Sequence, residues 1–428
     1  MLSGFDSLTA HEQCAHQQAF MNLTPLRPRT TLWAHDIIDH DVLRATCDGR
    51  KLSQGDFATS WRAVGIVSPA GRGGLMLAQG AGGGGGDQPV FDAGKNGTTH
   101  VLPSTKETVQ VGAMDGTLPA VLTIDSGDIV RYPDTWLMWG NEPTYGMSFE
   151  EREPIRRKYP QGPYSMPGPV AIRGAVPGDV VECRMRKLRP ISWGWNSAPH
   201  GVGALPTDYA EPYMQYFRFD DERTLANFGT SVQIPLRPLQ GVMSVQPASD
   251  KPVSAILTGA WGGNIVLSEL VAGTSLFLPV QVPDAKMWTG DSHAAQGDGV
   301  VDQTAIETAM EDLEIQYVLH KNRTLSGPVA ETTTHWIALG YSTDTLDDAI
   351  TAALRNTIAW ISAATDLSPQ DVYALCSIVG SFRVTQYAHQ VGTVYSSVPA
   401  KTVHGMVPKA VFHPDAARAI SAYFRTSS

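Results

Sequence analysis

The sequence predicts a mainly β protein, a β-sandwich or barrel, with an α+β portion at its C-terminal end. Two observations support this prediction. Between residue 99 and about residue 247, short runs rich in Val, Ile and Leu alternate with Pro, Gly and Asp turn signals, a spacing typical of consecutive strands. Helical periodicity is found only in residues 345–379.

Turn-then-strand units justify the β assignment. The turn Pro177-Gly178-Asp179 precedes the partly alternating residues 180–185, and the turn at residues 125–128 precedes another β-branched run. Residues 275–283 form a further apolar, proline-bounded segment. Short strands at this spacing favour a sandwich or barrel.

Two helices are expected after these strands. Apolar residues recur at three- and four-residue intervals from Leu346 to Ile361, and Asp344 is a candidate N-cap. A second helix should begin after Ser368, because Pro369 suits the first helical position and Asp371 completes a variant of the capping box. A strand over residues 381–386 follows, so the C-terminal portion is α+β.

Composition limits the class of protein. With 428 residues, 42% hydrophobic and 17% charged, the chain can bury a large core and is not generally disordered. Its net charge of −10 gives no electrostatic reason to bind nucleic acid or an anionic membrane. The four cysteines are scattered, which indicates neither a zinc ribbon nor a disulfide scaffold.

No apolar run is long enough to cross a bilayer. Residues 63–80 have some signal-peptide character, but Arg72 interrupts them and a long segment precedes them. We therefore expect a cytoplasmic protein, with export as the alternative, whose partner is a small molecule.

Five consecutive glycines at residues 82–86 mark a boundary, because such a run holds no fixed conformation by itself. No Lys-Ser/Thr follows it, so it is not a phosphate-binding loop. We expect residues 1–86 to be a variable extension whose deletion leaves the melting transition of the rest nearly unchanged. Residues 87–247 and 248–428 would be the two parts of the main fold.

Residues 290–299 concentrate the chemistry of the chain in a glycine-flanked loop. Asp291 and His293 can point the same way in an extended segment, and Asp298 can return after a turn at Gly297. The pair could hold a divalent metal ion or act as a base and its orienting group, and Gln296 could supply an amide donor. The alternative is that the aspartates cap turns and His293 is an ordinary semi-buried histidine.

Ten tryptophans include the close pairs Trp136/Trp139 and Trp193/Trp195. Such pairs could stack on a ligand, but large aromatic side chains more often fill β cores. Core packing is therefore expected.

A series of motifs resembles the acetamidase/formamidase family over roughly residues 99–410. Gly262-Gly263-Asn264 precedes a Leu-Pro-Val-Gln-Val-Pro run and then Gly-Asp-Ser-His-Ala-Ala-Gln-Gly-Asp-Gly at residues 290–299. Residues 118–128, 168–179, 193–196 and 382–386 agree as well. The number and shared order of these short motifs make the resemblance specific.

The resemblance implies a jelly-roll-like fold, a homo-oligomer and hydrolysis of small linear carboxamides to ammonia and a carboxylate. It implies that His293, Asp291 and Asp298 are catalytic, and that Asn264, Gln296 and His200 bind the substrate or the oxyanion. Asp291 and His293 would also be the ligands of any divalent metal, zinc or calcium.

The chain departs from the family where members carry His, Asp or Glu. These departures are Gln110, Tyr164, Val266, Val300 and Ser381. Valine cannot replace a carboxylate as a ligand or as an acid or base. A non-catalytic, ligand-binding homologue that has lost part of the site is therefore the alternative to an enzyme.

Overall fold

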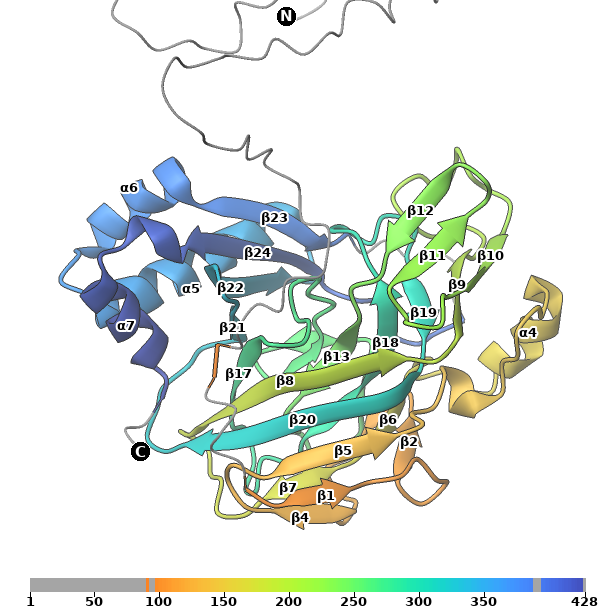
Figure 1. The fold of residues 1–428 in the computed structure, drawn as a ribbon, viewed down its shortest axis with the longest axis horizontal. Coiled ribbons are helices and arrows are strands. Elements are labelled where there is room, and N and C mark those ends of the chain that lie inside the picture. Colours follow the sequence, from red (N-terminus) through yellow and green to blue (C-terminus); the bar gives the residue numbers. More distant parts are fainter. Residues whose placement is uncertain (1–89, 92–96, 388–393, 426–428) are drawn as a thin grey trace, which may run out of the picture. The chain divides into compact units, whose positions relative to one another are not determined.

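The computed structural model describes residues 90–91, 97–387 and 394–425, all within one compact unit formed by residues 80–428 (Figure 1). The predicted extension, residues 1–86, lies outside the described residues. The expected parts 87–247 and 248–428 both contribute strands to each of the two large sheets.

The larger sheet has nine strands. In spatial order they are β1 (Thr99–Val101), β5 (Ile129–Pro133), β20 (Met310–His320), β8 (Val180–Pro190), β17 (Ser275–Pro279), β21 (Val329–Glu331), β22 (His335–Ser342), β24 (Lys401–Pro408) and β23 (Ser381–Gln386).

The second sheet has seven strands and carries the candidate site. In spatial order they are β10 (Tyr213–Arg218), β9 (Trp193–Ala198), β19 (Ile306–Thr308), β18 (Trp288–Ala295), β13 (Leu239–Ser244), β16 (Gly262–Asn264) and β15 (Thr258–Gly259). The strands of this sheet are all antiparallel to their neighbours.

Four two-stranded sheets complete the β structure: β2 (Val109–Val111) with β6 (Ser165–Pro167), β3 (Ala113–Met114) with β14 (Val253–Ser254), β4 (Leu122–Ile124) with β7 (Val170–Ile172), and β11 (Leu225–Phe228) with β12 (Val232–Pro235). The helical elements are α4 (Phe149–Arg156), α5 (Leu346–Ala364), α6 (Pro369–Val379), α7 (Pro414–Ala422) and the 3-10 turns η1 (Trp139–Asn141) and η2 (Lys409–Val411).

The main hydrophobic core takes buried side chains from both large sheets. Val181 of β8 and Ile315 of β20 come from the nine-stranded sheet, and Met243 of β13 comes from the seven-stranded sheet. Burying their apolar area against one another is the main force that holds the two sheets together. The predicted mainly β fold is confirmed, and the jelly-roll-like sandwich stays a prediction.

Helices α5, α6 and α7 gather beside β22, β23 and β24 (Figure 1). Trp360 and Ile361 of α5 pack with Trp336 of β22 in a second buried cluster. This confirms the α+β C-terminal portion. No helix in the described part of the chain is long and apolar enough to cross a membrane.

Local sequence sets the ends of these helices. Ser368 and Asp371 form the predicted capping box of α6, with Pro369 in its first position. The predicted cap of α5 is wrong by one residue, because Thr345 and not Asp344 accepts the hydrogen bond from the Asp348 N–H. Ser148 and Glu151 form a capping box that begins α4.

Candidate active site

Sheet register brings three ionisable side chains together. Asp291 and His293 lie on β18, and Glu307 lies on β19 directly opposite His293. His293 Nε2 is 3.2 Å from Asp291 Oδ2 and 3.1 Å from Glu307 Oε2. All three side chains are buried, so charge on this cluster must be balanced within the protein.

The residues predicted as a loop are therefore largely a strand, and its backbone is irregular. Asp291 has a φ of 56°, in the left-handed region that few residues other than glycine adopt. The register also shifts between His293 and Ala295. Gly241 of β13 lies beside Asp291, and a Cβ on Gly241 would overlap Asp291 Oδ2. The absence of a side chain at Gly241 leaves the room that the carboxylate occupies.

Gln296 fixes the orientation of the His293 ring. Its Nε2 donates to the Val266 carbonyl at 2.6 Å, so its Oε1 accepts from His293 Nδ1 at 2.8 Å. His293 Nε2 therefore faces Asp291 and Glu307. A lone pair there would be repelled by two carboxylates, so this arrangement needs a proton or another cation on that side of the ring.

The pKa values reflect this crowding. Burial raises the pKa of Asp291 to about 6, the negative charge of Glu307 adds to that increase, and His293 opposes it. Burial alone would lower the pKa of His293, but the two carboxylates raise it well above its usual value. The cluster is thus suited to exchanging a proton near neutral pH.

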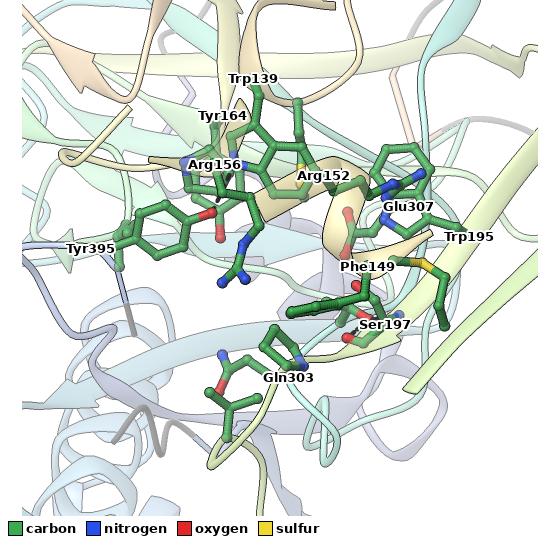
Figure 2. Close-up of a pocket in the computed structure, with 17 residues that line it drawn as sticks. Trp139, Phe149, Arg152, Arg156, Tyr164, Trp195, Ser197, Gln303, Glu307 and Tyr395 are labelled. Carbon is green, nitrogen blue, oxygen red and sulfur yellow. Dashed lines mark hydrogen bonds between the residues drawn. The ribbon is translucent and has the colours of Figure 1, made fainter. Parts of the chain in front are cut away.

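A cavity lies beside Glu307 (Figure 2). Its volume is about 70 Å³. One water molecule needs about 10–15 Å³ on this measure, so the cavity accommodates a molecule of only a few non-hydrogen atoms. Glu307 is the member of the cluster that lines it, and Asp291 and His293 are not among the lining residues.

Tyr164 lines the same cavity. Burial raises the pKa of its hydroxyl well above the usual value, and the negative charges of Asp291 and Glu307 raise it further. The hydroxyl therefore keeps its proton and can donate a hydrogen bond into the cavity. This tyrosine stands where the resemblance leads one to expect a histidine.

Two of the tryptophans pack in the core and also form part of the cavity wall. Trp139 and Trp195 are buried, as expected for core residues, and their rings stack with centroids 6.3 Å apart. Both also line the cavity (Figure 2).

Three of the residues predicted to join the site do not line the cavity. Asn264 is buried on β16 and does not itself line the cavity, but its Nδ2 donates at 3.3 Å to the carbonyl of Ile256, which does. His200 is exposed in the turn after β9 and does not line the cavity. The expected proximity of Asp298 to Asp291 and His293 is wrong, because Asp298 accepts a hydrogen bond from Ser268 at 2.7 Å.

Asp298 belongs to a second polar cluster with Glu269 and His404. Arg383 Nη1 is 3.5 Å from Asp298 Oδ2 and 3.6 Å from Glu269 Oε1. His404 Nε2 lies 3.7 Å from Glu269 Oε2. The guanidinium already supplies positive charge here, so this cluster is less suited to a cation than the first.

The first cluster has the donor set of a divalent metal site. Asp291 Oδ1, His293 Nε2 and Glu307 Oε2 are buried and have no hydrogen-bond partner among the described residues. The candidate ligand atoms, one imidazole nitrogen and two carboxylate oxygens, lie within 4.8 Å of one another. Zinc accepts this combination, and the imidazole makes calcium, which prefers oxygen ligands, the poorer fit.

Sequence reasoning missed Glu307, Tyr164 and the arginines that line the cavity. Glu307 belongs to no motif of the 290–299 segment, and its pairing opposite His293 depends on the length of the β18–β19 connection. Arg152 and Arg156 lie on α4, far from residue 290 in sequence. A four-residue spacing of arginines is common on solvated helix faces and by itself signals no site.

Comparison with known proteins agrees with this fold. Residues 255–413 match the model of the acetamidase/formamidase family. A putative formamidase of Schizosaccharomyces pombe is 24% identical over 189 aligned residues, which cover 31% of this chain and 46% of that relative. The sequence match therefore spans about half the length of that relative.

Solved structures extend the likeness over most of the chain. The acetamidase from Bacillus halodurans has 25% identity and a TM-score of 0.64, covering 73% of this chain and 98% of its own. The acetamidase from Yersinia enterocolitica has 25% identity and a TM-score of 0.64, covering 74% and 94%. These matches confirm the predicted resemblance to the acetamidase/formamidase family.

Proposed function

We propose that this protein hydrolyses short amides, releasing ammonia and a carboxylate. One observation carries the proposal: in a fold shared with acetamidases, Glu307 connects a buried imidazole–carboxylate cluster to a cavity of about 70 Å³. Formamide and acetamide are small enough for that volume.

The reaction adds water across the carbon–nitrogen bond. The oxygen of water bonds to the amide carbon, and one of its protons passes to Glu307, the carboxylate that faces the cavity. The resulting tetrahedral intermediate carries its negative charge on the former carbonyl oxygen. Return of the proton from Glu307 to nitrogen lets the carbon–nitrogen bond break, and ammonia and the acid leave.

His293 and Asp291 act through Glu307. A proton on His293 Nε2 balances the charge of Glu307 at 3.1 Å, and Asp291 at 3.2 Å favours that protonated ring. Gln296 holds the ring in place through Nδ1. In this assignment Gln296 is a positioning residue and not an oxyanion donor.

Tyr164 is the proposed donor to the oxyanion. Its hydroxyl is protonated and lines the cavity, and a donor already in place costs no reorganisation as the charge develops. If Asp291, His293 and Glu307 hold a divalent ion, that ion supplies Lewis-acid polarisation of the amide carbonyl.

Ammonia release from formamide, acetamide and propionamide, with and without added divalent ions, tests the proposal. Glu307→Gln should lower kcat/KM by about a hundred- to ten-thousand-fold, as loss of a general base typically does. Glu269→Gln, in the second cluster, is the matched control and should keep the parent's rate. An absence of ammonia from every amide, or a fully active Glu307→Gln variant, would contradict the proposal.

A further inference from the structure

The cavity beside Glu307 contains more positive than negative side chains. Its charged lining residues are Arg152, Arg156 and Glu307. The two arginines are four residues apart on α4, so both project from one face of that helix (Figure 2). A neutral amide such as acetamide has no anionic group that the two arginines could bind.

Arg152 is a buried cation without a carboxylate partner. Arg152 is 1% exposed. Among the described residues, no carboxylate oxygen lies within 4.0 Å of its guanidinium nitrogens. Nη2 donates to Tyr216 Oη at 2.8 Å, while Nε and Nη1 have no hydrogen-bond partner in that part of the chain. Leaving donors of a buried charge without partners destabilises the folded protein.

Contacts with aromatic rings offset part of the cost of burying the Arg152 charge. Its guanidinium carbon lies 4.1 Å from the centroid of Trp195 and 5.1 Å from that of Tyr216. A desolvated cation–π contact is favourable, but it contributes less than burying an unpaired ion costs. The rings pack against the guanidinium but leave its Nε and Nη1 without hydrogen-bond partners among the described residues.

Arg156 adds a second charge, which is only partly neutralised. Its Nη1 is 2.7 Å from Glu153 Oε2, but the other oxygen of Glu153 pairs with Arg157 at 2.7 Å. One carboxylate therefore serves two arginines. Figure 2 shows the Arg156 side chain extending between Tyr395 and Phe149.

We propose that the preferred substrate is an amide that carries a second, anionic group, the half-amide of a short dicarboxylic acid. Arg152 and Arg156 would bind its carboxylate while its amide faces Glu307, and this inference rests on the proposed amide hydrolysis. A carboxylate matches the planar fork of donors on a guanidinium. The cavity of about 70 Å³ limits the chain between the two groups to very few carbons, as in oxamate or malonamate.

The test compares malonamate with malonamide, which has the same shape but no charge. Charge-assisted hydrogen bonds contribute about 1.5–3 kcal/mol, so kcat/KM should be about 10- to 150-fold higher for malonamate. Arg156→Gln should erase most of this preference by raising KM for malonamate. Arg157→Gln, on the same helix but with a side chain 68% exposed, is the matched control and should retain the preference.

Calorimetry of malonate binding separates this inference from the proposed reaction. If ammonia is released equally from malonamide and malonamate, the anionic-substrate inference is wrong and amide hydrolysis stands. If no amide is hydrolysed but malonate binds to the parent and not to Arg156→Gln, the anion site stands and the proposed reaction fails. If malonate does not bind and no amide is hydrolysed, both are wrong.

Discussion

Glu182 and Glu307 are both buried carboxylates beside a histidine, but their surroundings differ. Glu182 accepts hydrogen bonds from Ser275 at 2.8 Å, Arg184 at 3.0 Å and Arg425 at 2.6 Å, and it lies 3.0 Å from His320 Nε2. Burial alone would raise the pKa of Glu182, but His320 and the two arginines hold it well below its usual value.

Glu307 has no such set of partners. Its Oε1 accepts one bond from the Ala305 N–H at 3.0 Å, and its Oε2, 3.1 Å from His293 Nε2, has no hydrogen-bond partner among the described residues. Asp291 adds a second negative charge to the same imidazole. In this cluster the carboxylates outnumber the cations, and one of them reaches a cavity.

The difference separates a charge cluster that stabilises the fold from one that can do chemistry. A fully paired carboxylate has its protonation state fixed, whereas an incompletely paired one can accept a proton or bind a cation. Burial of charge is common to both clusters. Incomplete pairing next to an open volume distinguishes the candidate site.

The largest expected effect is on activity. His293→Ala should lower ammonia release by about a hundred- to ten-thousand-fold, because Glu307 and Asp291 lose the group that balances them. His320→Ala, in the paired cluster, should keep the parent's kcat per folded molecule and lower the melting temperature. A His293→Ala variant that folds and retains the parent's rate would show that this cluster is not the chemical centre.

The next effect is on stability. Glu182→Gln should lower the free energy of unfolding by about 3–5 kcal/mol, because Arg425 and Arg184 lose a buried anionic partner. Glu314→Gln, at a partly exposed carboxylate 4.0 Å from Arg131, should change it by less than about 1 kcal/mol. Urea unfolding curves measure both, and equal losses would show that the buried Glu182 cluster stabilises the fold no more than an exposed ion pair does.

The pH dependence of stability should have opposite signs in the two clusters. Asp291 has a folded-state pKa of about 6 against an ordinary value of 3.8. Between about pH 4 and pH 6 the folded protein keeps a proton that the unfolded chain has lost, so this group's contribution to stability falls as pH rises. The loss reaches at most about 3 kcal/mol.

The contribution of Glu182 to stability depends on pH in the opposite direction. Its pKa is lowered on folding, so its contribution is present above about pH 4.5 and is lost as pH falls further. Unfolding measured from pH 3 to pH 7 in chelator-treated protein, for the parent, Asp291→Asn and Glu182→Gln, checks both signs. Parallel curves for the parent and Asp291→Asn would contradict the assignment.

Metal binding should produce the smallest of these effects. Zinc at about 100 times its dissociation constant should stabilise chelator-treated protein by about 2.7 kcal/mol, seen as a higher melting temperature. His293→Ala should lose this shift, and Glu269→Gln should keep it because Arg383 already balances that cluster. If zinc raises the melting temperature of both variants equally, the ion does not bind at the His293 cluster.

Local signals account for the elements that were predicted from sequence. The capping box at Ser368 and Asp371 and the turn before β8 act within a few residues, so their effect can be read without knowing the fold. The error at the start of α5 has the same origin, because Asp344 and Thr345 are both good caps and only one side chain is aligned with the Asp348 N–H.

The site was predicted in part for the same reason. Asp291, His293 and Gln296 lie within six residues, so a short segment is enough to bring them near one another. Asp298 is just as near in sequence, but the backbone after β18 turns it towards Ser268 and Arg383. Sequence distance alone could not separate these two outcomes.

The sequence by itself determined the mainly β class, the C-terminal helices and the segment that carries Asp291 and His293, because periodicity, caps and turns act over short distances. Only the tertiary structure placed Glu307 opposite His293 and brought Tyr164, Arg152 and Arg156 to the same cavity. Those positions depend on strand register and on the packing of α4 against Trp195. Both arise from contacts between residues far apart in the chain, and the energy that selects them is the burial of the whole core.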